Sequence, residues 1–172
     1  RGKIATYSQI TSAGNRLNVC AAVSPIYGII MYRVLLASWN QEEFSHFIND
    51  LLKHPLVSHR SHYLVMDRVK WHHTELIDDV LQGQRIQHEI KLLPPYSPHL
   101  NPIEYCFHLW KTEIKNTPQT QSSNLREQVD RAAAKITPAV VSSCLDHVYQ
   151  YYVHCINEKP LEEFVPYRAP ET

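Results

Sequence analysis

A proline-rich junction between a strand and a helix constrains the fold of this chain more than any other segment. A short apolar run at 90–93 leads into a bend at 94–98 that has prolines at its first, second and last positions. Pro102 is the residue type that suits the first turn of a helix, and Asn101 before it is a favoured N-cap. The pattern predicts that a stiff bend delivers Glu104 to the first turn of a helix. A carboxylate fixed at such a junction is a candidate ligand for a metal ion.

Apolar periodicity elsewhere predicts an alternation of strands and helices. Continuous or alternating apolar runs indicate strands, and apolar repeats at three and four residues indicate helices. Asn40 and Asn124 are predicted to cap two of the helices. The predicted strands are 17–26, 28–36, 63–67 and 88–93, and the predicted helices are 41–52, 73–81, 102–114, 125–136 and 138–156. Antiparallel strands followed by strand–helix alternation predict an α/β fold, a mixed sheet with helices on both faces.

Composition excludes several classes of protein. With 172 residues, 44% of them apolar and 20% charged, the chain can bury a core and is not disordered. The four cysteines lack a CxxC pair, which argues against a disulfide framework or a zinc site. No apolar run approaches the ~20 residues that cross a bilayer, so we expect no membrane association. The formal net charge of zero supports nucleic-acid binding only weakly, because phosphate binders usually carry a basic surplus.

The junction also carries a motif. From Pro94 to Glu104 the chain reads PPYSPHLNPIE, and Phe107 and Lys111 follow at the spacing NPIExxFxxxK. This motif resembles the third acidic motif of mariner-like DDE transposases, enzymes that cut and join DNA. The resemblance implies a ribonuclease H-like mixed sheet flanked by helices, with extra C-terminal helices. It also implies that Glu104 is a catalytic metal ligand and that Asn101 lines the site. A plainer interpretation is a proline-rich loop in which Glu104 only complements the helix dipole.

The stretch MDRVKWH at 66–72 is similar to the second motif of the same family, an Asp-Asn pair with a His five residues after the Asp. Asp67 and His72 match this motif, while Arg68 replaces the Asn. The resemblance implies that Asp67 is a catalytic metal ligand, that His72 and Arg68 line the site, and that Mg²⁺ or Mn²⁺ is the cofactor. Clustered carboxylates suit such hard cations, which activate the attacking oxygen and stabilise the leaving oxygen. Alternatively, Asp67 caps the turn after its strand.

The family's first catalytic acid has no counterpart in this sequence. No Asp or Glu precedes Glu42, and the opening residues 1–5 resemble a segment that follows the first acidic strand in the family. We therefore expect a ribonuclease H-like core at 1–116 that lacks its first acidic strand. Residues 117–172 are expected to be a C-terminal helical extension of the same domain. A site with two acids should bind metal poorly.

The resemblance also implies partners. Lys70, Lys111 and Lys115 are possible DNA contacts, although solvated lysines are common on helices. The complete protein would bind DNA, both transposon ends and target, and would form a homodimer. If the organism is eukaryotic, the protein is expected in the nucleus.

Two hypotheses on function remain open. In the first, the chain is the catalytic-domain fragment of a mariner-like DNA transposase that cleaves phosphodiester bonds and transfers strands in the complete protein. In the second, it is a domesticated, catalytically inactive module for DNA binding or protein assembly. Arg68 in place of Asn, the missing acid and the zero net charge favour the second hypothesis.

Overall fold

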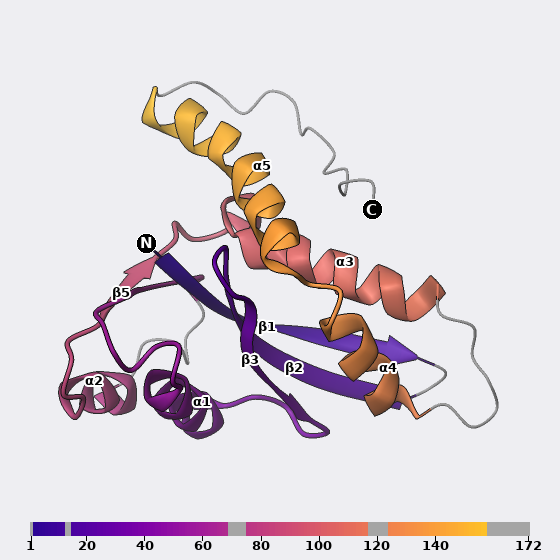
Figure 1. Ribbon diagram of the computed structural model, residues 1–172, viewed down its shortest axis with the longest axis horizontal. Helices are drawn as coiled ribbons and strands as arrows, with labels where there is room; N and C mark the ends of the chain where they lie inside the picture. Colours follow the sequence, from indigo (N-terminus) through magenta and orange to yellow (C-terminus); the bar gives the residue numbers. More distant parts are fainter. Residues whose placement is uncertain (1, 13–14, 69–74, 117–123, 158–172) are drawn as a thin grey trace.

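A five-stranded sheet with helices on both faces organises the chain (Figure 1). The computed structural model describes residues 2–12, 15–68, 75–116 and 124–157. The order of strands across the sheet is β3-β2-β1-β4-β5. β2 is antiparallel to both β1 and β3, while β4 runs parallel to β1 and β5 runs parallel to β4. The strands are β1 (Gly2–Ser12), β2 (Asn15–Ser24), β3 (Gly28–Leu35), β4 (Tyr63–Met66) and β5 (Glu89–Leu92).

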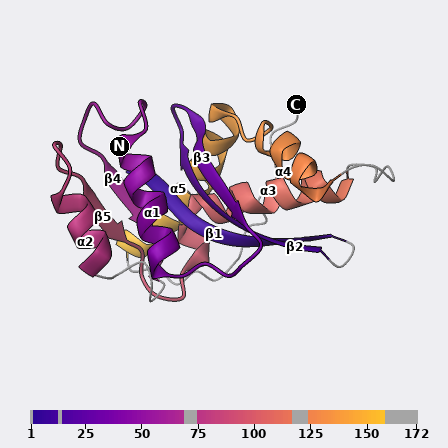
Figure 2. The same ribbon diagram turned by 90° about the horizontal axis from the view of Figure 1, so that it is seen from below.

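Two groups of helices cover the two faces of the sheet, as the ribbon in Figure 2 also shows. One face is covered by α1 (Gln41–Lys53) and α2 (Glu75–Gln82). The other face is covered by α3 (Pro102–Asn116), α4 (Leu125–Ala133) and α5 (Pro138–Ile156). None of the helices in the described part of the chain is long and apolar enough to span a membrane.

Strand β2 is buried on both of its faces, which explains its nearly continuous apolar sequence. Successive side chains of a strand point to opposite faces. Cys20 and Ala22 accordingly pack in the core under α1 and α2. The alternate residues pack in the core under α3, α4 and α5; they are Leu17, Val19, Ala21 and Val23. The sheet therefore has a hydrophobic core on each side.

The helices begin where their capping residues predict. The Asn40 side chain accepts a hydrogen bond from the backbone N–H of Glu43 at 2.9 Å, and α1 starts after it. Asn124 caps α4 by accepting from the backbone N–H of Arg126 at 3.0 Å. These bonds satisfy N–H groups that have no partner inside the helix. The predicted helices and the four predicted strands are confirmed, with shifts of a few residues at their ends.

Strand β1 is the main difference from the sequence prediction. No strand was predicted before residue 17, yet Gly2–Ser12 forms one at the centre of the sheet, between β2 and β4. That the family's first acidic strand is missing stays a prediction. The polar sequence of β1 has no strong apolar alternation. Its pairing with β2 and β4 therefore decides its structure, and the pattern of neighbouring residues does not predict such pairing. The strand brings no Asp or Glu into the centre of the sheet.

Helix α5 forms a hydrogen bond and apolar contacts with the segment that precedes α3. The Tyr152 hydroxyl donates a hydrogen bond of 2.7 Å to the backbone carbonyl of Leu100, which lies in the short 3₁₀ helix η2 (Pro98–Leu100). Leu100 also packs with Leu93 and Tyr151 in a small core of its own. The C-terminal helix thus holds the bend that leads to Glu104.

Removing this hydrogen bond should destabilise the chain. Tyr152→Phe leaves the carbonyl of Leu100 without its donor, so the free energy of unfolding should fall by about 1 kcal/mol. Tyr149→Phe is the matched control, because Tyr149 lies on the same helix and is 65% exposed. Urea unfolding of both variants measures the difference, and equal stabilities would contradict the anchoring role of Tyr152.

Candidate active site

Asp67 and Glu104 line the same pocket, which has a volume of about 370 Å³. Asp67 directly follows the last residue of β4, and Glu104 lies in the first turn of α3. The wall between them is formed by the bend at 94–98 together with Asn101 and Arg68. The two carboxylates that the motifs singled out are therefore brought together by the fold.

Pairing between parallel strands explains why these segments meet. The backbone N–H of Leu93 donates to the carbonyl of Met66 at 2.9 Å, which extends the β4–β5 ladder by one bond. Residues after both strands consequently leave the sheet at the same edge. Ligands of open α/β sheets bind at this edge, outside the carboxyl ends of the strands.

Backbone hydrogen bonds fix the segment between β5 and Glu104. The N–H of Leu100 donates to the carbonyl of Ser97 at 3.0 Å, and the N–H of Asn101 donates to that of Pro98 at 2.9 Å. The N–H of Glu104 then donates to the carbonyl of Asn101 at 3.1 Å. These bonds and the fixed φ angles of the prolines make the approach to Glu104 stiff.

The Glu104 carboxyl lies in an unfavourable electrostatic environment. Burial raises its pKa, the negative charge of Asp67 raises it further, and the positive charge of Lys111 lowers it. A cation beside the Glu104 carboxylate would favour its charged form. The electrostatics thus match a cation site.

Lysines follow Glu104 on the same face of α3. Lys111 and Lys115 come seven and eleven residues after Glu104, a spacing that keeps side chains on one side of a helix. Lys111 is half-buried, and burial lowers the pKa of its ammonium group, while the charge of Glu104 opposes this shift. Lys115 is exposed. A neighbouring stripe of the helix is buried in the core: Ile103, Phe107, Trp110 and Ile114.

Asn101 corrects one prediction and supports another. It precedes α3, but its side chain does not cap the helix; only its backbone carbonyl accepts from the helix. The side chain is fully buried, and neither its Oδ1 nor its Nδ2 finds a hydrogen-bond partner among the residues that the structure describes. A buried amide without partners is costly. Its place in the pocket wall makes a bound polar ligand the natural partner.

The donors of the pocket fit one hard divalent cation. Two carboxylates and an amide oxygen are the kind of ligand that Mg²⁺ and Mn²⁺ bind, with water completing the shell. Within the described ranges, no three His, Cys, Asp or Glu side chains lie together as a metal site. The described residues alone thus do not supply the carboxylates of a two-metal centre.

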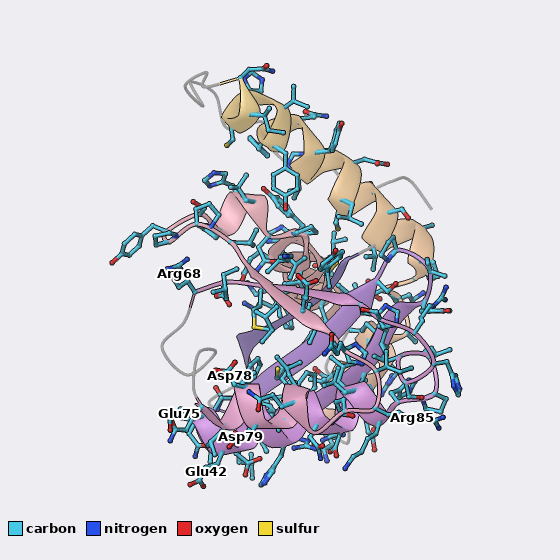
Figure 3. The ribbon with its side chains drawn as sticks, turned by 90° about the vertical axis from the view of Figure 1, so that its left-hand side faces the viewer. Glu42, Arg68, Glu75, Asp78, Asp79 and Arg85 are labelled. Carbon is cyan, nitrogen blue, oxygen red and sulfur yellow. The ribbon has the colours of Figure 1, made fainter. Side chains whose placement is uncertain are left out.

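The remaining candidate residues fall in different places. Arg68 is exposed in the pocket wall. Figure 3 shows Arg68 apart from the acidic side chains of α1 and α2 (Glu42, Glu75, Asp78 and Asp79). Lys70 and His72 lie outside the described residues.

The sequence analysis gave no role to Tyr96, which also lines the pocket. The signal that could have singled it out is its position inside the motif, with prolines before and after it.

The fold and the pocket define a class of protein. Three antiparallel strands followed by two parallel ones, with helices on both faces and carboxylates at the strand ends, form a ribonuclease H-like α/β domain. The family of DDE superfamily endonucleases matches residues 1–126, and the chain belongs to this family. The family predicted from the two motifs is thereby confirmed.

Solved structures show the same fold at low sequence identity. The catalytic domain of Mos1 mariner transposase is 17% identical with a TM-score of 0.73, over 94% of this chain and 84% of that one. A structure of the same domain with Raltegravir and Mn is 16% identical with a TM-score of 0.72, covering 92% and 82%. In a pre-cleavage Mos1 transpososome the match is 14% identical with a TM-score of 0.76, over 92% of this chain and 55% of the Mos1 chain. No curated protein matches the chain significantly.

The raised pKa of Glu104 predicts a pH-dependent effect of removing its charge. Between the ordinary pKa of a glutamate, about 4.3, and the raised value, the folded state binds a proton more strongly than the unfolded state. The stability contributed by this group therefore falls as the pH rises through that range. Glu104→Gln should be more stable than the wild type at pH 7, and the difference should shrink below about pH 4.3.

Urea unfolding at pH 7 and at pH 4 tests this expectation. Glu42→Gln is a suitable control, because Glu42 is exposed in the first turn of α1 and its charge is favourable there. The control should gain no stability at pH 7. A loss of stability in Glu104→Gln at pH 7 would show that the carboxylate is not held in a disfavoured state.

Proposed function

We propose that this chain is the catalytic core of a mariner-like DNA transposase, built for metal-dependent cleavage and joining of phosphodiester bonds. The observation that carries the proposal is the meeting of Asp67 and Glu104 in one pocket at the strand ends of a ribonuclease H-like sheet. Membership of the DDE endonuclease family supports the reaction class. In a complete protein, the substrate would be the transposon ends and the target DNA.

In this proposal, Asp67 and Glu104 hold a divalent cation, and the Asn101 side chain contributes its amide oxygen or orients a water. Such an ion polarises a phosphate and lowers the pKa of bound water. The structure of the Mos1 catalytic domain with Mn supports this choice of ion. Burial and the nearby charge of Asp67 both raise the pKa of Glu104, which supports the uptake of a positive charge by the pocket.

Positive side chains around the pocket would hold the DNA. Lys111 and Lys115 extend along α3 from Glu104, and Arg68 is an exposed residue of the pocket wall. Phosphate binding needs a local basic surface and does not need a positive net charge. The zero net charge of the chain is compatible with such a surface because acidic side chains gather separately on α1 and α2 (Figure 3). The Mos1 transpososome and paired-end complexes support DNA as the partner and a dimer as the working form.

The alternative is a module that binds DNA or another protein without cleaving DNA. The absence of an acid from β1 favours this alternative for the chain as it stands. We propose that the pocket binds one metal ion weakly and that cleavage needs a third carboxylate from the central strand. If the host is eukaryotic, this work takes place in the nucleus.

Calorimetric titration with Mn²⁺ tests the proposed metal site. The wild-type chain should bind the ion weakly, and Asp67→Ala and Glu104→Ala should each weaken binding at least tenfold, which corresponds to ~1.4 kcal/mol. The exposed acidic residues of α1 provide the control, since Glu42→Ala should leave the affinity unchanged. Equal binding by the wild type and the double variant Asp67→Ala/Glu104→Ala would rule out the site.

Introducing an acid into β1 tests whether the pocket needs a third carboxylate. Ile4 pairs with Val65, so the register continued by two residues brings position 6 level with Asp67. Thr6→Asp should strengthen Mn²⁺ binding roughly tenfold and give metal-dependent nicking of supercoiled plasmid. Ala5→Asp is the matched control, because successive residues of a strand alternate between its faces. Identical behaviour of the two variants would contradict the proposed position of the third acid.

A further inference from the structure

Tyr96 has the most exposed large hydrophobic side chain in the described part of the chain. Its exposed fraction is 100%, compared with 83% for Leu36 and 65% for Tyr149. Exposing a whole aromatic ring forgoes a large hydrophobic contribution. The ring therefore contributes no packing to the fold, and its role must lie outside the core.

The backbone at Tyr96 is strained. Its φ is 57°, and it is the one non-glycine residue with positive φ among those that the structure describes. For a bulky side chain this left-handed conformation is unfavourable, and glycine or asparagine is the usual choice. Residues kept in such a conformation concentrate at ligand-binding positions.

The bend holds this conformation firmly. In the sequence, Tyr96 follows Pro94 and Pro95 and is two residues before Pro98. The Ser97 hydroxyl donates a hydrogen bond of 3.2 Å to the carbonyl of Pro95. The backbone hydrogen bonds of η2 fix the end of the bend that leads to α3. The ring is thus presented from a stiff support, which lowers the entropy lost when it binds a partner.

The position of the residue relates it to the carboxylates. Tyr96 belongs to the bend that lines the pocket of Asp67 and Glu104, while its ring is fully exposed. A strand whose phosphate reached those carboxylates through a cation would carry its neighbouring base past the bend. An exposed aromatic ring is the side chain on which an unpaired base stacks, and such stacking tolerates any base.

We propose that Tyr96 is a stacking platform for an unpaired nucleobase next to the phosphate held at Asp67 and Glu104. The inference rests on the proposed function, because it needs a nucleic acid strand in the pocket. It adds a contact to the base, whereas the lysines of α3 contact the backbone. It implies that the strand is locally unpaired where it enters the site.

Binding of a single-stranded oligonucleotide of about twelve nucleotides in Mn²⁺ tests this inference. Fluorescence anisotropy gives the affinity, and 2-aminopurine at successive positions reports stacking through its quenching. Tyr96→Ala should weaken binding roughly tenfold and abolish the quenching at one position, whereas Tyr96→Phe should retain both. Tyr149→Ala is the control for an exposed tyrosine away from the pocket and should behave as the wild type. The Tm of Tyr96→Ala should not fall, since the ring packs on nothing.

An oligonucleotide of abasic sites separates stacking from backbone contact. The wild type and Tyr96→Ala should bind the abasic oligonucleotide equally. If Tyr96→Ala lost the same affinity for the abasic oligonucleotide as for the normal one, the stacking role would be overturned. Unchanged DNA binding by Tyr96→Ala would also overturn the stacking role. If that variant bound DNA normally but changed its oligomeric state, the ring would belong to a contact between proteins. If the stacking role failed but Asp67→Ala/Glu104→Ala still lost Mn²⁺-dependent binding of DNA, the proposed function would stand. Failure of the wild type to bind either oligonucleotide would overturn both proposals.

Discussion

The parallel pairing of β4 with β5 is the interaction on which the geometry of the site depends. The hydrogen bond from Leu93 to Met66 ends this ladder, and directly beyond it the chain turns away from the sheet on both strands. Asp67 and the proline bend consequently start from neighbouring points. The bend then needs only a short 3₁₀ turn to bring Glu104 back over the same edge. Each later feature of the pocket follows from this common origin.

The same pocket concentrates groups that the fold alone leaves poorly satisfied. Glu104 is half-buried near another carboxylate, Asn101 has a buried amide without a partner in the described residues, and Tyr96 has a strained backbone. Each of these features lowers stability, and the two hydrophobic cores offset them. Unfavourable features that gather in one pocket are typical of a binding site, because a ligand can relieve several of them together.

Local sequence rules could predict where Asp67 and Glu104 lie, at a strand end and in the first turn of a helix. That the two carboxylates share a site was implied by the resemblance of their motifs to one family. Prolines, a helix start and a strand end are readable from neighbours in sequence. Strand β1 could not be predicted in this way, because its polar sequence becomes a strand only through pairing with two distant segments. The environment of Asn101 was equally hidden: the same residue is a good helix cap by local rules, and only tertiary packing removes its side chain from that role.

The account stands on the claim that Asp67 and Glu104 form one cation site. Anomalous X-ray scattering from crystals soaked in Mn²⁺ is the most direct measurement. The account predicts a single strong peak between the carboxylates of Asp67 and Glu104, within coordination distance of both. No peak in that pocket, or a peak only beside the acidic side chains of α1 and α2, would contradict it.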